Sequence, residues 1–134
     1  MALDVTHRPT TRWRRQVDDQ AAAVAAGTLD AGKAYAAELW PPAFLAAADA
    51  VLVTLEREAA ALSATASDEQ IWAVVQHAVE GLNAADDGHI ETGEREALAD
   101  YVDGVLTGAG IDVPALTARR GRDRHELTDQ WRQW

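Results

Sequence analysis

The segment from Asn83 to Glu94 carries the residue types that bind a divalent cation. It reads NAADDGHIETGE, and Asn83, Asp87, Glu91 and Glu94 offer carboxylate or amide oxygens, which are the ligands that calcium prefers. His89 adds a backbone carbonyl or, for a transition metal, a ring nitrogen. These five residues are the candidate metal ligands.

The spacing of these residues resembles the 12-residue EF-hand calcium loop. With Gly88 at the sixth position, where the family has a glycine for a sharp turn, Glu94 falls at the twelfth, where the family has a bidentate glutamate. The resemblance covers this loop alone and implies a single calcium site. Ala85 stands at the third position and Asn83 at the first, so fewer charged ligands predict weak affinity.

The same segment also fits a simple connection between two helices. Asn83 or Gly88 would then end the first helix, since both residue types tolerate the left-handed conformation that closes a helix. Asp86, Asp87 and Glu91 would stay in solvent and favour the positive N-terminus of the second helix. We favour the connection and keep the ion site as the alternative.

Acidic residues dominate from position 80 to position 103, and they form the candidate surface for a basic protein partner. Glu96, Asp100 and Asp103 follow spacings of four and three, which place them on one stripe of a helix. Arg95 is the one lysine or arginine of this stretch. The complete set of candidate partner-binding residues is Glu80, Asp86, Asp87, Glu91, Glu96, Asp100 and Asp103.

The net charge of −10 is unevenly distributed along the chain. Residues 1–15 and 119–134 carry net charges of +3 and +2, whereas residues 16–118 carry −15. This charge argues against a nucleic acid as the partner of the main body. Trp13, Trp131 and Trp134 alternate with arginine in the basic ends. We expect both ends to pack on the acidic middle, and stacking on a nucleic acid or a protein is the alternative.

Sequence motifs of enzymes are missing, because the chain has no nucleophile elbow, P-loop or dinucleotide-binding fingerprint. Neighbouring carboxylates such as Glu56 and Glu58 are two residues apart and face different sides of a helix. His77, with Glu80 one turn later, reads as a partly exposed surface residue. We lean towards a protein without enzymatic activity, and an acid/base site assembled from distant residues is the remaining enzyme hypothesis.

Composition narrows the class of protein further. The chain has no cysteine, so it has no disulfide framework and no thiolate zinc site. No apolar run approaches the roughly 20 residues of a membrane span, and the first residues lack an apolar signal core. We expect a cytoplasmic protein with no membrane partner and no resident cofactor. Abundant arginine and alanine with little lysine suit a bacterium with a GC-rich genome.

Helical patterns cover almost the whole chain. Apolar residues recur at spacings of three and four, and capping residues stand before the repeats. Predicted helix starts lie at Thr10 or Thr11, Asp30, the pair Pro41-Pro42, Ser67, Thr92, Asp112 and Asp123, the last helix carrying Leu127, Trp131 and Trp134 on one face. We predict an all-α fold: a single domain, residues 1–134, forming a helical bundle or orthogonal array of five to seven helices.

The size, charge and fold class of the chain look like those of bacterial immunity proteins and antitoxin-like inhibitors. This resemblance implies a small module that binds and neutralises a basic toxin. We therefore expect a protein-binding module, with the single-site calcium protein as the alternative.

Overall fold

The computed structural model describes residues 7–134, and within this range the chain is all-α. The prediction of five to seven helices is confirmed, because this range holds six α-helices and no strand. The α-helices are α1 (Pro9–Ala25), α2 (Ala36–Leu39), α3 (Pro42–Ala61), α4 (Asp68–Ala85), α5 (Thr92–Gly108) and α6 (Val113–Ala118). The 3-10 turn η2 (Ala31–Lys33) lies between α1 and α2, and the 3-10 turn η3 (Arg124–Glu126) lies in the segment after α6.

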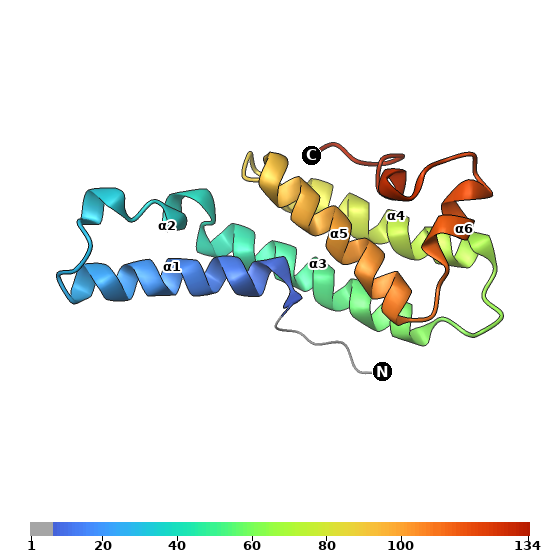
Figure 1. The fold of residues 1–134 in the computed structure, drawn as a ribbon, viewed down its shortest axis with the longest axis horizontal. Coiled ribbons are helices and arrows are strands. Elements are labelled where there is room, and N and C mark those ends of the chain that lie inside the picture. The colour runs from blue at the N-terminus through green and yellow to red at the C-terminus, as the bar shows by residue number, and fades with distance from the viewer. Residues whose placement is uncertain (1–6) are drawn as a thin grey trace.

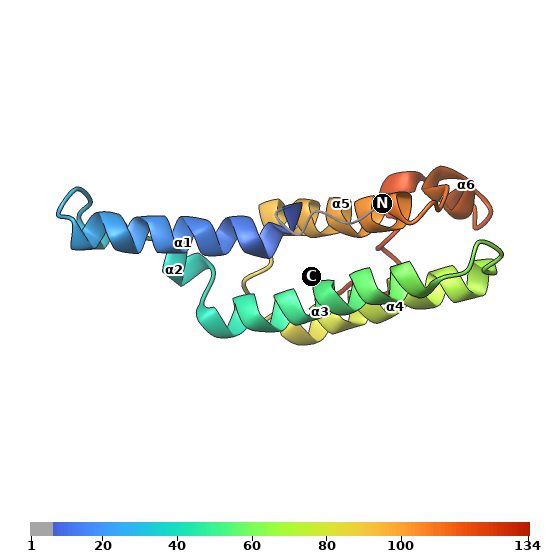
Figure 2. The ribbon, with the colours of Figure 1, turned by 90° about the horizontal axis from the view of Figure 1, so that it is seen from below.

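The helices lie in two layers. In one layer α3 and α4 run antiparallel, and in the other α1 and α5 lie roughly end to end (Figure 2). The hairpin of α1 and α2 projects beyond the body formed by α3, α4 and α5 (Figure 1). The segment after α5 carries α6 and η3 and returns along α4 and α5. One groove lies between this C-terminal segment and α4, and another lies between it and α5.

Several helix boundaries follow from local signals, as predicted. The Ser67 hydroxyl accepts from the Gln70 backbone N–H at 3.2 Å, and the Gln70 side chain accepts from the Ser67 N–H at 2.9 Å, which completes a capping box for α4. Pro42 opens α3, and Asp112 accepts from the Ala115 N–H at the start of α6.

Two predicted caps are wrong. Arg8 precedes α1, and neither of the two predicted threonines caps it. Thr10 is instead fully buried, and its hydroxyl donates to Asp49 of α3 at 2.7 Å, so a tertiary contact takes the side chain that could have capped the helix. Glu91, rather than Thr92, caps α5 through a reciprocal box with Glu94.

Two predicted helices are much shorter than expected. Asp30 caps only the turn η2, and the chain then forms the four-residue helix α2. The capping box of Asp123 and Glu126 is present, but it opens only η3, and turns follow it. The predicted helical face of Leu127, Trp131 and Trp134 is therefore wrong.

Tertiary contacts shape the C-terminal segment instead. Trp72 of α4 is 2% exposed and packs against Trp131, with ring centroids 6.0 Å apart. The guanidinium of Arg120 lies 4.3 Å from the Trp72 ring centroid. Trp134 is buried, and its ring N–H donates to the Val79 carbonyl. Trp134 thus belongs to the core, and Trp131 packs at the edge of it.

The core joins all the long helices. The apolar stripes predicted for α3, α4 and α5 are buried, and Trp13 of α1 stacks on Trp40 with ring centroids 5.6 Å apart. Each fully buried large side chain contributes about 1.5–3 kcal/mol, so this core is the main source of stability. Within residues 7–134, none of the helices combines the length and hydrophobicity that crossing a membrane requires.

Candidate functional site

The loop between α4 and α5 is a tight turn closed by its own acidic residues. One carboxylate oxygen of Asp86 accepts from the backbone N–H groups of His89 and Ile90, both at 3.0 Å. Gly88 has a φ of +83°, a left-handed conformation that glycine adopts without strain. Ile90 is buried, and the His89 ring packs on Phe44 at 5.4 Å between centroids.

The candidate metal ligands of this loop have separate structural roles. Asn83 is part of α4, where its side-chain amide donates to the Trp131 carbonyl and its side-chain oxygen accepts from the Gln133 N–H, both at 2.9 Å. Glu91 and Glu94 bind each other's backbone N–H groups in the cap of α5. Calcium would have to displace these bonds to use the three side chains.

Asp87 is exposed and has no partner within residues 7–134, so it alone of the oxygen ligands is free. No group of three or more histidine, aspartate or glutamate side chains in the described range is placed to hold an ion. These contacts favour the interpretation of residues 83–94 as a helix connection. The resemblance to an EF-hand rests on spacing that the fold uses for caps.

The candidate partner-binding acids are divided among three places. Glu80 lies beside the groove between α4 and the C-terminal segment, and Gln76 donates to it. Asp86, Asp87 and Glu91 lie in the loop. Glu96, Asp100 and Asp103 come together on α5, as their spacing predicts.

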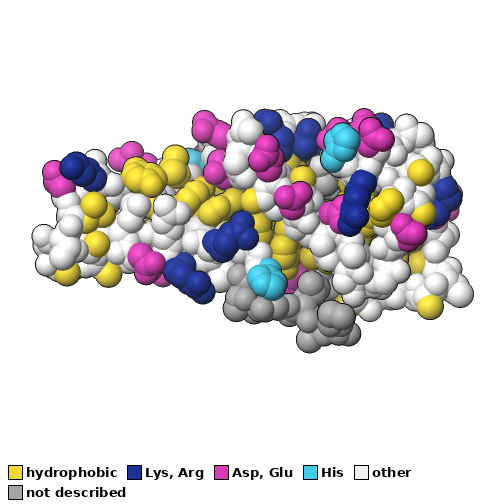
Figure 3. Space-filling view, in the orientation of Figure 1, with side chains coloured by type: hydrophobic (Ala, Val, Ile, Leu, Met, Phe, Trp, Pro, Cys, Tyr) yellow, Lys and Arg dark blue, Asp and Glu magenta, His cyan; other side chains and the backbone are white. Residues whose placement is uncertain are grey.

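Acidic and basic side chains are interspersed over α5 and the segment beside it (Figure 3). Glu96 and Asp100 are exposed and have no ion-pair or hydrogen-bond partner in the range that the structure covers. Asp103 differs, because both its oxygens accept from Arg124 at 2.7 Å and Thr107 donates to it. The free acidic stripe is therefore one residue shorter than predicted.

The three acids line a groove between α5 and the C-terminal segment, which we call the α5 groove. Its volume is about 280 Å³. Glu96, Asp100 and Asp103 share the α5 side with Ala99 and Arg95, and the other side consists of Arg124, His125, Leu127, Thr128 and Arg132. The groove thus combines apolar surface with charged rims.

Each arginine of the α5 groove already has a partner within the chain. Arg95 donates to the Trp134 carbonyl at 3.2 Å, and Arg124 is paired with Asp103. Arg132 pairs with Asp129 at 3.1 Å and lies over the Trp134 ring. Among the residues that the structure describes, the groove charges left without a partner are the carboxylates of Glu96 and Asp100.

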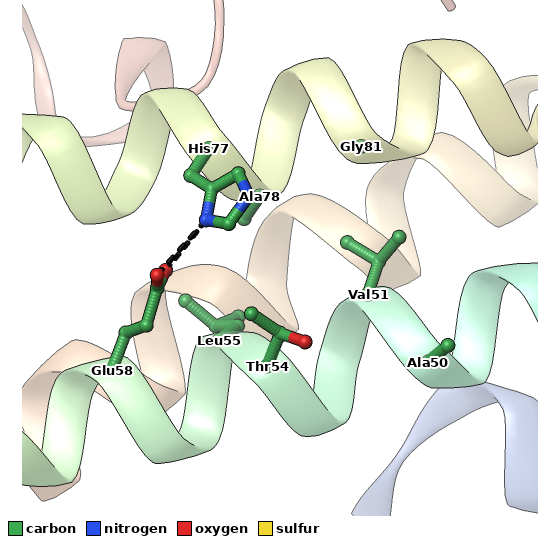
Figure 4. Close-up of a pocket in the computed structure, with 8 residues that line it drawn as sticks. All are labelled: Ala50, Val51, Thr54, Leu55, Glu58, His77, Ala78 and Gly81. Carbon is green, nitrogen blue, oxygen red and sulfur yellow. Dashed lines mark hydrogen bonds and ion pairs between the residues drawn. The ribbon is translucent and has the colours of Figure 1, made fainter.

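A second groove, with a volume of about 210 Å³, lies between α3 and α4 (Figure 4). At one end the ring Nδ1 of His77 lies 2.9 Å from both carboxylate oxygens of Glu58. At the other end Val51 faces Gly81, where the two helices approach closely. His77 therefore pairs across the helices with Glu58, and not with Glu80. Its side chain is 62% exposed, as expected of a surface residue.

A polar cluster at the α1–α3–α5 junction was missed by sequence reasoning. Arg8 donates two hydrogen bonds of 2.6 Å to Glu56, and the Tyr101 hydroxyl donates a third at 2.7 Å. Asp49 lies 3.6 Å from the same guanidinium. Glu56 falls four residues after Leu52 on the buried stripe of α3, and a charge on that stripe was the available signal.

The contacts of this cluster perturb its titration. Burial raises the pKa of Glu56, but the hydrogen bonds from Arg8 and Tyr101 and the charge of Arg8 outweigh burial, so its pKa lies below its ordinary value. Burial, together with the hydrogen bond to the Glu56 carboxylate, raises the pKa of Tyr101. All partners in the cluster come from the chain itself, so the cluster is a structural junction between helices.

Terminal arginines meet acids of the middle segment at three places. Arg8 pairs with Glu56, Arg119 with Asp68 and Arg124 with Asp103. Beside these pairs, the α5 groove is the place where candidate partner-binding residues lie together with the free carboxylates of Glu96 and Asp100.

Comparison of the chain with protein-family models, with curated proteins and with solved structures found no match to any of them.

Proposed function

We propose that this protein is a protein-binding module that docks a basic partner on the acidic side of the α5 groove. The observation that carries the proposal is the state of Glu96 and Asp100, which are exposed and lack partners within residues 7–134 although three arginines line the same groove. The three arginines of the groove bind other groups of the chain, so two negative charges are available to a partner. Asp87 and Glu91 extend the acidic surface towards the loop.

The architecture suits such docking. Both carboxylates stand on a regular helix with a buried inner face, so a partner would meet them without reordering the backbone. The net charge of −10 would accelerate encounter with a basic protein, an effect that salt screens. Inhibition of a basic toxin, as in the immunity and antitoxin proteins, is the role that this chemistry fits best.

Capture of the partner from the source cell, followed by calorimetry with the purified pair, tests the proposal. We expect Glu96→Gln with Asp100→Asn to weaken binding roughly tenfold, since rim charges contribute about 1 kcal/mol or less each. Asp18→Asn with Asp19→Asn is the matched control, because it removes the same charge from exposed positions of α1. Equal losses in the two variants, or an affinity that does not change with salt, would refute docking on the α5 groove.

A further inference from the structure

We infer that Asp87 is a site of spontaneous covalent modification, at which the side chain closes on the backbone nitrogen of Gly88 and reopens in part as isoaspartate. This modification is independent of the proposed docking, because its reactants are groups of the chain itself and water. The reaction needs a free carboxyl group and a free backbone N–H on the next residue. The loop between α4 and α5 supplies both.

The dipeptide Asp-Gly occurs twice in the chain, at positions 87–88 and 103–104. A glycine after the aspartate favours ring closure, because no side chain shields its nitrogen. The sequence by itself therefore makes the two places equivalent. Steric crowding does not separate them either, since a Cβ placed on Gly88 or on Gly104 meets no atom within 4 Å. The two places differ in how the fold holds the carboxyl group and the backbone.

At Asp103 the fold holds both reactants. Its two carboxylate oxygens accept from Arg124 at 2.7 Å, and one of them also accepts from Thr107 at 3.1 Å. Gly104 lies inside α5, where the backbone N–H belongs to the regular hydrogen bonding of the helix. Ring closure rotates the peptide unit away from helical geometry, so at this position it requires local unfolding of α5.

At Asp87 the fold holds neither reactant. The side chain is exposed and has no partner within residues 7–134, and over the same range the N–H of Gly88 donates to no acceptor. Both residues lie between the end of α4 and the start of α5, so rotation of this peptide unit breaks no helix. The preceding Asp86 differs, because one of its oxygens accepts from the N–H groups of His89 and Ile90. We therefore expect the reaction at Asp87 and not at its neighbour.

The reaction needs only the chain and water. The Gly88 nitrogen loses its proton and attacks the side-chain carboxyl carbon of protonated Asp87, so a new C–N bond forms. The bond from that carbon to its hydroxyl group breaks, and the hydroxyl leaves with a proton as water, which gives a succinimide ring. Water then opens the ring at either carbonyl. Cleavage of the new C–N bond restores aspartate, whereas cleavage of the original peptide C–N bond leads the main chain through the side chain and gives isoaspartate.

Isoaspartate at position 87 would change the loop as well as its charge. The main chain gains one carbon atom between Asp86 and the two N–H groups that its carboxylate binds at 3.0 Å. Those hydrogen bonds close the turn, so a longer chain should weaken them. The free carboxylate also moves from the side-chain position to the former main-chain carbon.

Incubation of the folded protein at neutral pH in water labelled with heavy oxygen tests the inference, because each cycle of ring closure and hydrolysis transfers one labelled oxygen to the residue. Mass spectrometry after proteolysis locates the label, and electron-transfer fragmentation distinguishes isoaspartate from aspartate. We expect both signals at Asp87 and incorporation at least about tenfold slower at Asp103, which the helix protects. Incubation in urea is the matched control, since both positions should react at similar rates in the unfolded chain.

Asp87→Glu keeps the charge and should abolish the label at this position, because the longer side chain would have to close a larger and less favourable ring. In the isoaspartate fraction of the wild type, the amides of His89 and Ile90 should exchange with solvent faster than in the unmodified protein. Incorporation at Asp87 no faster than at Asp103 in the folded protein, or label retained in Asp87→Glu, would overturn the modification site, and unchanged exchange would overturn its effect on the loop. None of these measurements involves a partner, so the proposed docking is judged separately.

Discussion

Removal of the Glu56 charge tests the junction between α1, α3 and α5. Glu56→Gln keeps the shape of the side chain but leaves the Arg8 guanidinium, whose side chain is 15% exposed, without its main counter-charge. The Glu56 side chain is 12% exposed, and its carboxylate accepts three hydrogen bonds of 2.6–2.7 Å. The substitution should therefore weaken the attachment of the N-terminus of α1 to the rest of the molecule.

The size of the effect follows from the contacts. Breaking a fully buried ion pair by removing one partner costs about 3–5 kcal/mol. Here Asp49 remains 3.6 Å from Arg8, and both paired side chains keep some access to water. We therefore expect the substitution to lower the free energy of unfolding by about 2 kcal/mol, which is less than for a fully buried pair. For a chain of 134 residues such a loss lowers the midpoint of thermal unfolding by about 7 °C.

Urea unfolding monitored by circular dichroism at pH 7 measures this loss, with Glu58→Gln as the control. Glu58 lies two residues away on the same helix, and its partner His77 is largely exposed, so its loss should cost less than about 1 kcal/mol. A Glu56→Gln variant as stable as the Glu58→Gln variant would show that the junction contributes nothing and would refute the reasoning.

The same variant has a distinct pH dependence. The folded-state pKa of Glu56 lies below its ordinary value of 4.5, so its stabilisation is present above that pH and is lost as the pH falls through the folded pKa. The difference in unfolding free energy between wild type and Glu56→Gln should be constant above about pH 6 and shrink below about pH 4.5. A difference that stays constant down to acid unfolding would contradict the lowered pKa.

Four further outcomes are expected. Gly81→Ala places a Cβ 3.0 Å from the side chain of Val51 and should lower the free energy of unfolding by about 1–2 kcal/mol. Gly104→Ala, which meets no atom within 4 Å, should raise it by about 0.5–1 kcal/mol through the helix propensity of alanine. Urea unfolding compares the two variants, and equal effects would contradict the close approach of α3 and α4. Asn83→Ala removes the hydrogen bonds that attach the C-terminal segment to α4, so acrylamide should quench the tryptophan fluorescence more strongly in the variant than in the wild type, equally in EDTA and in calcium. A difference between variant and wild type that occurs only in calcium would support the ion site instead. Ser67→Ala should cost about 1 kcal/mol through the cap of α4, and an unchanged melting temperature would argue against the box. Because the pKa of Tyr101 is raised in the folded protein, its hydroxyl stabilises the fold fully below pH 10, and this stabilisation is lost as the pH rises towards the folded pKa. Above pH 10 the free energy of unfolding should therefore fall less steeply with pH in Tyr101→Phe than in the wild type, and equal slopes would contradict this.

The middle of the chain was the most predictable part. The stripes of α3, α4 and α5 and the Ser67 cap depend on residues within four positions of each other, and such local patterns are visible in a sequence. The ends were less predictable. The capping box at Asp123 was identified correctly, yet contacts with α4 and α5 keep the chain beyond it from continuing as a helix.

The candidate site shows the same division. The stripe of Glu96, Asp100 and Asp103 follows from helical spacing, and the structure keeps it on one side of a groove. The pairing of Asp103 with Arg124 is invisible in the sequence, because it depends on where the returning tail lies.

The sequence by itself thus determined the helices and their caps, whereas the tertiary structure determined which surface charges are paired. Periodicity and capping act over a single helical turn, so they specify an all-α chain before any packing is known. Ion pairs join residues that are 48 positions apart, as for Arg8 and Glu56, or 21 apart, as for Asp103 and Arg124. Coulomb interactions weaken with distance in space and take no account of distance along the chain, so only the tertiary structure decides which carboxylates stay free.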